Sequence, residues 1–219
     1  MRITRIESQK RRPGRKNIYA DGKFLAGVSA ETLLRLALRA GDDVGPGQLA
    51  ALMKTEELVS ARNTALRFLT TRPRTLREIR DKLREKEFPE EEIRRVITDL
   101  TTAGLLNDEE FARMFVRNAL AIRPTGQLVV KRKLLALGIP KAIAEEAIAE
   151  EMPPDSTHEQ ALKAAKQFLR KNRTRQQKEP AVKLRSRLAG FLARRGFGWD
   201  TIEPVLRTFL HQSPENPNE

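Results

Sequence analysis

The sequence predicts a mainly α-helical protein made of stacked small helical units, with a small β element at its N-terminus. Two observations predict this class: an apolar spacing that recurs three times along the chain, and an Asp-Gly turn between two short strand-like segments. The composition agrees with both, because only 5% of the 219 residues are aromatic. Several thin helical layers suit such a composition better than one large core.

The apolar spacing consists of six positions in one register. The first set is Ile79, Leu83, Phe88, Ile93, Val96 and Ile97. The register returns 51 residues later at Val130, Leu134, Ile139, Ala144, Ala147 and Ile148, and 109 residues after the first set at Leu188, Leu192, Phe197, Ile202, Val205 and Leu206. A repeat of about 50 residues indicates three-helix units that bury their apolar faces by stacking, and such arrays usually bind other molecules rather than catalyse reactions.

The β element is expected within residues 1–28. Asp21-Gly22 favours a two-residue hairpin turn, because both residue types tolerate the positive φ angles that such a turn requires. The segment around Ile3 and Ile6 is a candidate third strand. A basic loop over residues 10–16 lies between this segment and the hairpin.

Capping residues and helix breakers indicate where the helices begin and end. Ser29 is the expected cap of a first helix, and a longer helix is expected over roughly 47–71. Thr75 and Glu78 form a capping box that starts a further helix. The predicted domains are a β-hairpin plus helix at 1–57, three-helix repeats at 58–106, 107–155 and 156–213, and a disordered tail at 214–219.

The residues that enzymes and metal sites depend on are scarce. Cysteine is absent, which excludes disulfides, thiol nucleophiles and Cys-based zinc sites. His158 and His211 are far apart in polar surroundings, and the glycine-containing segment 41–47 lacks the residues of a phosphate-binding loop. We therefore expect a protein that is not an enzyme and that uses no cofactor and no metal.

The sequence also lacks the signals of membrane or secreted proteins. It has no apolar run of about 18 residues, and its N-terminus has no apolar stretch of the secretory type. We expect a cytoplasmic protein, monomeric and without a membrane partner.

The net charge of +13 favours a polyanion or an acidic protein surface as the partner. The charge is uneven along the chain. Residues 163–197 hold twelve Lys and Arg against one acid, and residues 1–23 hold eight against two. Residues 141–160, by contrast, carry one Lys against six acids.

Clustered Lys and Arg side chains are the candidate binding residues, because they neutralise phosphates and release counterions. The candidates are Lys131, Arg132, Lys133, Arg170, Lys171, Arg173, Arg175, Lys178, Lys183, Arg185 and Arg187. Arg77, Arg80 and Arg84 lie on the equivalent helix of the first repeat, where neighbouring acids offset them. Stacked repeats would join these cations into one stripe. Trp199 follows Phe197 closely, and we expect it to pack in the core.

Two segments resemble the RecX family of regulatory proteins. Residues 65–83, ALRFLTTRPRTLREIRDKL, are similar to the first repeat of that family, and residues 104–117, GLLNDEEFARMFVR, are similar to its junction into the second repeat. Gly126, Lys133-Leu134 and Gly138-Ile139 match further along. The similarity is sharp over about 60–150 and weaker, though in register, over 160–210.

The resemblance implies a fold and a function. The fold is mainly α, with tandem three-helix, winged-helix-like repeats in an elongated array behind a small N-terminal β-hairpin. The function is that of a non-catalytic modulator of the RecA recombinase, which binds RecA and the RecA–DNA filament, mostly inhibits filament growth, and thereby affects recombination and the SOS response. The partners implied are RecA and single-stranded or filament-bound DNA, without sequence preference and without a cofactor.

Two other functions are compatible with the same residues. Three-helix units with basic second or third helices are used by DNA-binding modules that read the major groove, either architectural or transcriptional. A passive assembly scaffold is the third possibility, and in that case the positive charge would be incidental. A base-sequence preference in the absence of RecA would favour the DNA-binding module.

Overall fold

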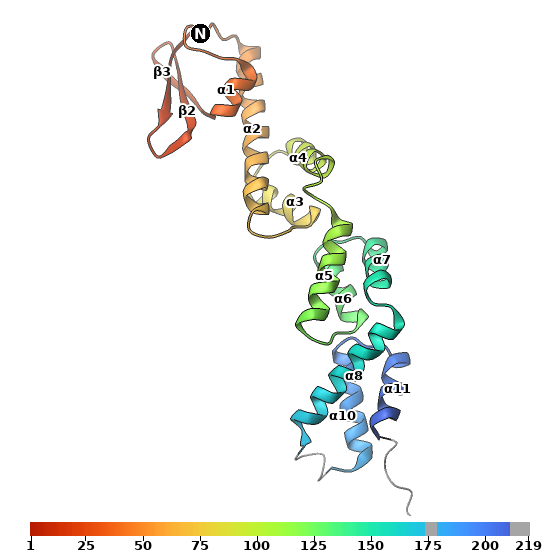
Figure 1. Ribbon diagram of the computed structural model, residues 1–219. Coiled ribbons are helices and arrows are strands. Elements are labelled where there is room, and N and C mark those ends of the chain that lie inside the picture. The colour runs from red at the N-terminus through yellow and green to blue at the C-terminus, as the bar shows by residue number, and fades with distance from the viewer. Residues whose placement is uncertain (174–178, 211–219) are drawn as a thin grey trace, which may run out of the picture. The chain divides into compact units, whose positions relative to one another are not determined.

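The computed structural model describes residues 1–173 and 179–210, and the chain divides into two compact units, Met1–Leu106 and Asn107–Glu219 (Figure 1). The first unit holds a three-stranded sheet followed by four helices, and the helices described in the second unit follow without a further strand. The mainly α-helical fold with an N-terminal β element is therefore confirmed.

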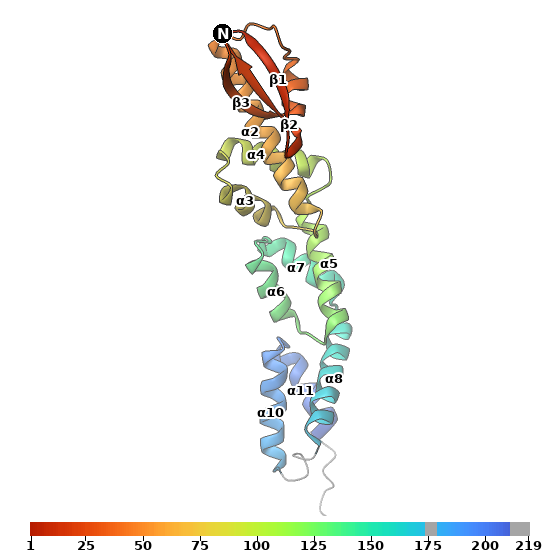
Figure 2. The same ribbon diagram turned by 90° about the vertical axis from the view of Figure 1, so that its left-hand side faces the viewer.

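The sheet is antiparallel, with the strand order β1 (Ile3–Gln9), β2 (Arg12–Ala20) and β3 (Lys23–Ser29) (Figure 2). Asp21 and Gly22 have φ angles of 47° and 78°, so the turn between β2 and β3 is of the predicted two-residue hairpin type. The candidate third strand around Ile3 and Ile6 is also confirmed, as β1.

Two helices cover the sheet, α1 (Ala30–Leu36) and α2 (Pro46–Leu69). Ser29 caps α1 as predicted, because its Oγ accepts a hydrogen bond from the backbone N–H of Thr32 at 3.0 Å. The core between sheet and helices consists of Ile3, Ile18, Ala26, Val28, Leu33, Val44 and Leu52.

A buried carboxylate fixes α2 to the corner where the sheet meets α1. Glu56 is 8% exposed, and its Oε2 accepts hydrogen bonds from the backbone N–H of Ser29 at 2.6 Å and from the hydroxyl of Thr32 at 2.7 Å. Its Oε1 pairs with Arg15 on β2 at 2.9 Å. A buried charge is tolerated only with such partners, so this network sets the position of α2 on the sheet.

Within residues 1–173 and 179–210, nine helical segments form three repeats of three helices. The first repeat uses the C-terminal half of α2 with α3 (Leu76–Glu85) and α4 (Glu90–Thr102), the second uses α5 (Asp108–Ile122), α6 (Gln127–Ala136) and α7 (Lys141–Glu151), and the third uses α8 (Pro154–Lys171), α10 (Ala181–Arg194) and α11 (Trp199–Leu210). Every predicted register position is buried except Phe88, which is half-buried and packs against the core of the first repeat.

Two helices run across predicted domain boundaries. The boundary between 57 and 58 lies inside α2, which contributes Leu52 to the sheet core and Ala61 and Ala65 to the core of the first repeat. The boundary between 155 and 156 lies in the first turn of α8. The division into domains stays a prediction.

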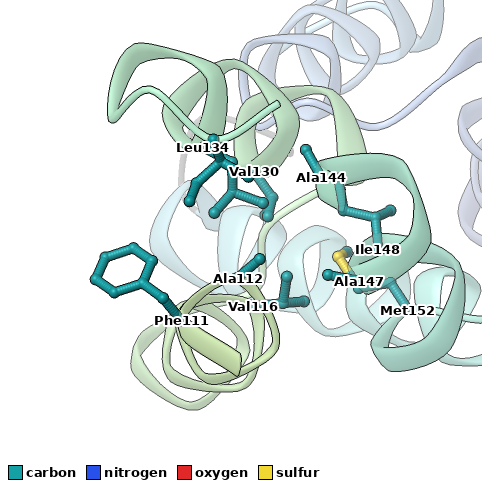
Figure 3. Close-up of a cluster of buried hydrophobic side chains, with 10 residues drawn as sticks. Phe111, Ala112, Val116, Val130, Leu134, Ala144, Ala147, Ile148 and Met152 are labelled. Atoms are coloured by element: carbon teal, nitrogen blue, oxygen red, sulfur yellow. The ribbon is translucent and has the colours of Figure 1, made fainter. Parts of the chain in front are cut away.

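The core of the second repeat shows how each unit is closed. Figure 3 shows Val130 and Leu134 of α6 facing Ala144 and Ile148 of α7, with Val116 of α5 beneath them. Val130 and Leu134 are fully buried. The small side chain of Ala144 lets the third helix approach the other two closely, so an aliphatic cluster without a buried ring at its centre fills the space.

The second and third repeats join through their backbones at two glycines. The N–H of Gly126, the N-cap of α6, donates to the carbonyl of Arg195 at 2.8 Å, and the N–H of Leu128 donates to the carbonyl of Gly196 at 3.1 Å. A Cβ at Gly126 would lie 2.2 Å from the carbonyl carbon of Gly196. Gly196 also has a φ of +87°, so both positions favour glycine.

We predict that Gly126→Ala breaks this joint. The added methyl group meets backbone rather than a movable side chain, so the free energy of unfolding should fall by roughly 1–3 kcal/mol. The amide of Leu128 should lose its protection from hydrogen exchange. Gly47→Ala is the matched control, because a Cβ there meets nothing within 4 Å, and it should not destabilise the protein. If Gly126→Ala were as stable as the wild type and its Leu128 amide exchanged as slowly, the two repeats would not be joined at these glycines.

We also predict that Leu134→Ala destabilises the second repeat. Leu134 is fully buried between three helices, so its truncation leaves a cavity and should cost roughly 2–5 kcal/mol in urea unfolding. Leu135→Ala is the control, because Leu135 is 39% exposed. Equal unfolding midpoints for the two variants would contradict the assigned register.

Candidate nucleic-acid interface

Three of the four cations on the second helix of the first repeat, Arg77, Lys82 and Arg84, are paired with acids, whereas Arg80 forms no ion pair with a described residue. The Nε of Arg77 lies 3.6 Å from Asp81, and the Nη2 of Arg84 lies 3.0 Å from Glu90. Contact with a phosphate would require these pairs to break, so α3 offers little net positive charge to a polyanion.

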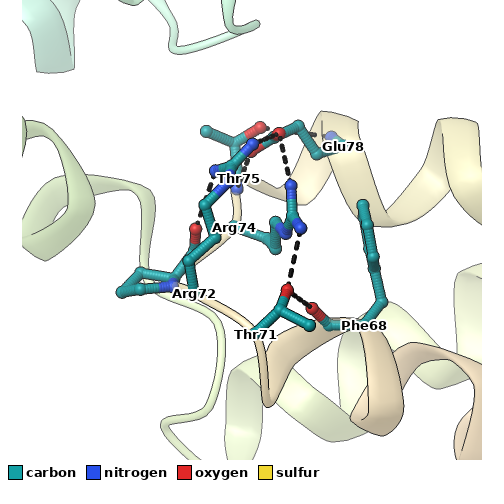
Figure 4. A network of polar contacts seen from close by, with 7 residues as sticks. Phe68, Thr71, Arg72, Arg74, Thr75 and Glu78 are labelled. Carbon is teal, nitrogen blue, oxygen red and sulfur yellow. Dashed lines mark hydrogen bonds and ion pairs between the residues drawn. The ribbon is translucent and has the colours of Figure 1, made fainter.

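The arginines of the turn that precedes α3 are also paired with an acid (Figure 4). Glu78 accepts hydrogen bonds from Arg72, from Arg74 at 3.4 Å and from the backbone N–H of Thr75 at 3.1 Å, and this completes the predicted capping box. Partial burial raises the pKa of Glu78, but the hydrogen bonds from Arg72 and Thr75 outweigh it, and the net pKa is lowered. The guanidinium of Arg74 also stacks on the ring of Phe68 at 3.8 Å from its centre.

The predicted residues on α6 divide into one paired and two exposed cations. Lys131 forms an ion pair with Glu145 of α7, and its hydrogen bond lowers the pKa of that carboxyl. Arg132 and Lys133 are exposed and form no ion pair with any described residue. We call Arg132 and Lys133 the α6 patch.

Two of the predicted residues on α10 hold the third repeat together. Arg185 donates to both carboxylate oxygens of Glu203 on α11 at 2.8 Å. Arg187 pairs with Glu179 and donates to the side chain of Asn172 at 3.3 Å, just beyond the end of α8. Through these contacts the two arginines tie α10 to α11 and to the end of α8.

A second exposed group lies where the end of α8 approaches α10. It consists of Arg170, Lys171, Arg173 and Lys183, all exposed and without an ion pair to any described residue, and we call it the α8–α10 patch. Arg170 and Lys171 also suit the negative end of the α8 dipole. Arg175 and Lys178 lie outside the described residues.

The α8–α10 patch lies near the N-terminal half of α10, whereas the α6 patch lies on a helix that begins at the turn after the C-terminus of α10. Its N-terminal half meets the end of α8 through Arg187 and Asn172, whereas the turn after its C-terminus meets the start of α6 through Arg195 and Gly126. The 14 residues of α10 span about 20 Å, so the predicted cations of these repeats form separate groups rather than one cluster.

The sequence analysis missed a third group of arginines at this joint. Arg123, Arg194 and Arg195 line a pocket of about 250 Å³ together with Val129 and Phe191. The signal available was the repeat of Arg72-Pro73 as Arg123-Pro124, 51 residues later. The expected core position of Trp199 was wrong: its side chain is 63% exposed at the start of α11.

The described residues contain neither a candidate metal site nor a candidate membrane span. None of their His, Asp and Glu side chains gather in groups of three or more that would suit a metal ion. Within the same residues, no helix is long and apolar enough to cross a bilayer.

The fold and the surface define a class of protein: tandem three-helix repeats behind a small sheet, with exposed cations on the second and third repeats. Sequence models of one family match the chain in consecutive segments. They are described as the regulatory protein RecX N-terminal domain at residues 1–45, and the first, second and third three-helix domains of RecX at 61–100, 107–148 and 158–206. The chain belongs to the RecX family of regulatory proteins.

Known relatives and solved structures support membership of the same family. The regulatory protein RecX of Clostridioides difficile (strain 630) is 31% identical over 95% of this chain and 96% of its own, and that of Clostridium perfringens (strain SM101) is 29% identical over 94% and 95%. A crystal structure of regulatory protein RecX aligns with a TM-score of 0.75 at 27% identity, over 93% of this chain and 98% of the other. RecX from Lactobacillus salivarius aligns with a TM-score of 0.64 at 26% identity, over 69% and 96%.

We predict that Glu78→Gln destabilises the first repeat at neutral pH and not in acid. The lowered pKa means that the carboxylate is the form that stabilises the fold, so its contribution is present above the ordinary value of 4.5 and is lost as the pH falls through the folded-state value. The loss of the charge should cost roughly 1 kcal/mol at pH 7.

Urea unfolding of the wild type and of Glu78→Gln at about pH 7 and about pH 3 measures the difference in their free energies of unfolding. Glu57→Gln is the control, because Glu57 is exposed on α2 and forms no ion pair with a described residue. A difference between wild type and Glu78→Gln that is equally large at both pH values would contradict the electrostatic explanation.

Proposed function

We propose that this chain is a non-catalytic regulator that binds the RecA recombinase and the RecA–DNA filament and modulates filament growth, mostly by inhibition. Recombination and SOS activity would be its downstream targets. In this proposal it acts in the cytoplasm as a monomer, without a cofactor. The observation that carries the proposal is the match of four RecX family models in order along the chain.

The surface charge supports a partner that contains DNA. The α6 patch and the α8–α10 patch hold exposed cations that no described acid neutralises, whereas Arg77, Lys82 and Arg84 of α3 are paired. Free cations release counterions from phosphates without first losing an ion pair, so they favour binding to a polyanion. Lys and Arg side chains carry no base-specific information at phosphates, which agrees with binding without sequence preference.

The direct test adds the purified chain to RecA on single-stranded DNA with ATP. We expect ATP hydrolysis to fall and filaments to shorten as the ratio of the chain to RecA rises. The variant Arg170→Gln/Lys171→Gln/Arg173→Gln should require a higher ratio for the same effect. The control Arg77→Gln/Lys82→Gln/Arg84→Gln removes the same charge from paired positions and should act nearly as the wild type does.

Unchanged ATP hydrolysis and filament length up to stoichiometric ratios would contradict the proposed function. Equal losses in the two triple variants would contradict the role of the α8–α10 patch and leave net charge as the determinant.

A DNA-binding module that acts without RecA is the second candidate. The exposed α6 patch favours it, because α6 is the second helix of a three-helix unit. Binding of duplexes of different base sequence in the absence of RecA separates the two. A defined sequence preference would favour the module, and equal binding with steep salt dependence would favour the RecA regulator.

A further inference from the structure

The turn before the second helix has the same sequence frame in the first two repeats. Arg72-Pro73 corresponds to Arg123-Pro124 at the offset of 51 residues, and the N-cap Thr75 corresponds to the N-cap Gly126. The third residue of the helix differs, because Glu78 of the first repeat corresponds to Val129 of the second.

This difference removes the only acid of the turn. In the first repeat, the carboxylate of Glu78 binds both Arg72 and Arg74. In the second repeat, Val129 offers no carboxylate, and Arg123 is exposed without an ion pair to any described residue. The arginines of this turn are therefore paired with a carboxylate in the first repeat, whereas the arginine of the same turn in the second repeat has no such partner among the described residues.

The third repeat increases the positive charge instead of cancelling it. The Nη1 of Arg195 donates to the carbonyl of Pro124 at 2.8 Å, and the guanidinium lies 4.9 Å from the centre of the Phe191 ring. Arg194 lies exposed in the last turn of α10, also without an ion pair to a described residue. Burial, and then the nearby Arg123, lower the pKa of Arg195, because both disfavour its positive charge.

These arginines surround a pocket whose lining holds no acid. The pocket has a volume of about 250 Å³ and is lined by Arg123, Thr125, Val129, Phe191, Arg194 and Arg195. Other cation-lined hollows of the described chain are different: the one beside Arg94 also holds Glu91, and the one beside Arg67 also holds Glu56. We call the pocket at the glycine joint the joint pocket.

We propose that the joint pocket binds a phosphate group of the DNA backbone, with Arg123 and Arg194 as the ligands and Arg195 as a fixed cation at its wall. The inference rests on the proposed function, because it identifies one DNA contact of that function. Planar guanidinium groups match phosphate oxygens in pairs, and the backbone joint holds the helices that carry them in place.

The position of the pocket favours a polymer rather than a free anion. The helix α6 begins at the pocket, and the exposed Arg132 and Lys133 follow one to two turns later on the same helix. A strand whose phosphate occupies the joint pocket can therefore continue along further cations, whereas a single inorganic phosphate cannot use them.

The test measures the binding of labelled single-stranded DNA to the full chain by fluorescence anisotropy over a range of salt concentrations. The variant Arg123→Gln/Arg194→Gln keeps Arg195 and its hydrogen bond, and both substituted side chains are exposed, so folding should be preserved. We expect its affinity to fall roughly three- to tenfold, and the slope of log K against log salt to decrease by about 0.7, the value for one phosphate contact with single strands.

The matched control is Arg77→Gln/Arg84→Gln, which removes the same charge from positions paired with Asp81 and Glu90. Its affinity and slope should stay close to those of the wild type. Equal losses in the control and the variant would overturn the proposal, because net charge alone would then explain them.

Phosphorus NMR with inorganic phosphate distinguishes the source of the anion. If wild type and variant bind DNA equally while only the wild type broadens the phosphate signal, the pocket takes a free anion and the DNA proposal is overturned. If neither DNA nor phosphate distinguishes the two proteins, the pocket binds no phosphate and the proposal is likewise overturned.

The RecA assay separates this inference from the proposed function. A wild-type chain that inhibits RecA, together with a variant that binds DNA normally, would overturn the joint pocket alone. A wild-type chain without effect on RecA, together with a variant of weakened DNA binding, would overturn the proposed function and support the pocket as a DNA contact.

Discussion

Each repeat depends on the burial of a small hydrophobic cluster between three helices. In the second repeat the cluster includes Leu134 on α6 and Ala144 on α7, and the aromatic Phe111 lies only at its edge (Figure 3). Such a core is thin, so most residues of every helix stay at the surface. The surface can therefore carry many charges. The repeats then differ from one another in which of these charges form ion pairs.

The start of the second helix is stabilised differently in the first two repeats. In the first, the side chain of Glu78 accepts hydrogen bonds from the turn, as in an ordinary capping box. In the second, backbone carbonyls of the third repeat accept the N–H groups of Gly126 and Leu128. The third repeat thus replaces the carboxylate in capping the helix but not in neutralising the arginines, and the joint is both a structural contact and a concentration of positive charge.

Local patterns in the sequence were sufficient for the fold. The six-position register, the Asp21-Gly22 turn and the Ser29 cap each depend on residues close in sequence, and each was confirmed. The pairing of charges was not predictable in the same way. Arg185 meets Glu203 on another helix, and Gly126 meets the third repeat 70 residues later, so only the packing of helices shows which cations are free. The prediction that Trp199 packs in the core was wrong, because apolar character alone does not specify which face of a helix is buried.

The free energy available to a bound phosphate differs among the three kinds of arginine in this chain. The guanidinium of an arginine such as Arg84 lies 3.0 Å from Glu90, and the negative charge of that carboxylate offsets the attraction of the arginine for a phosphate. An exposed arginine such as Arg132 gains the interaction but is well solvated beforehand. Arg195 is half-buried, and burial and the nearby Arg123 both disfavour its charge and lower its pKa. A phosphate in the joint pocket would be attracted by both guanidinium groups in a site less exposed to water than either patch, so each of these attractions is screened less there than at a fully exposed arginine.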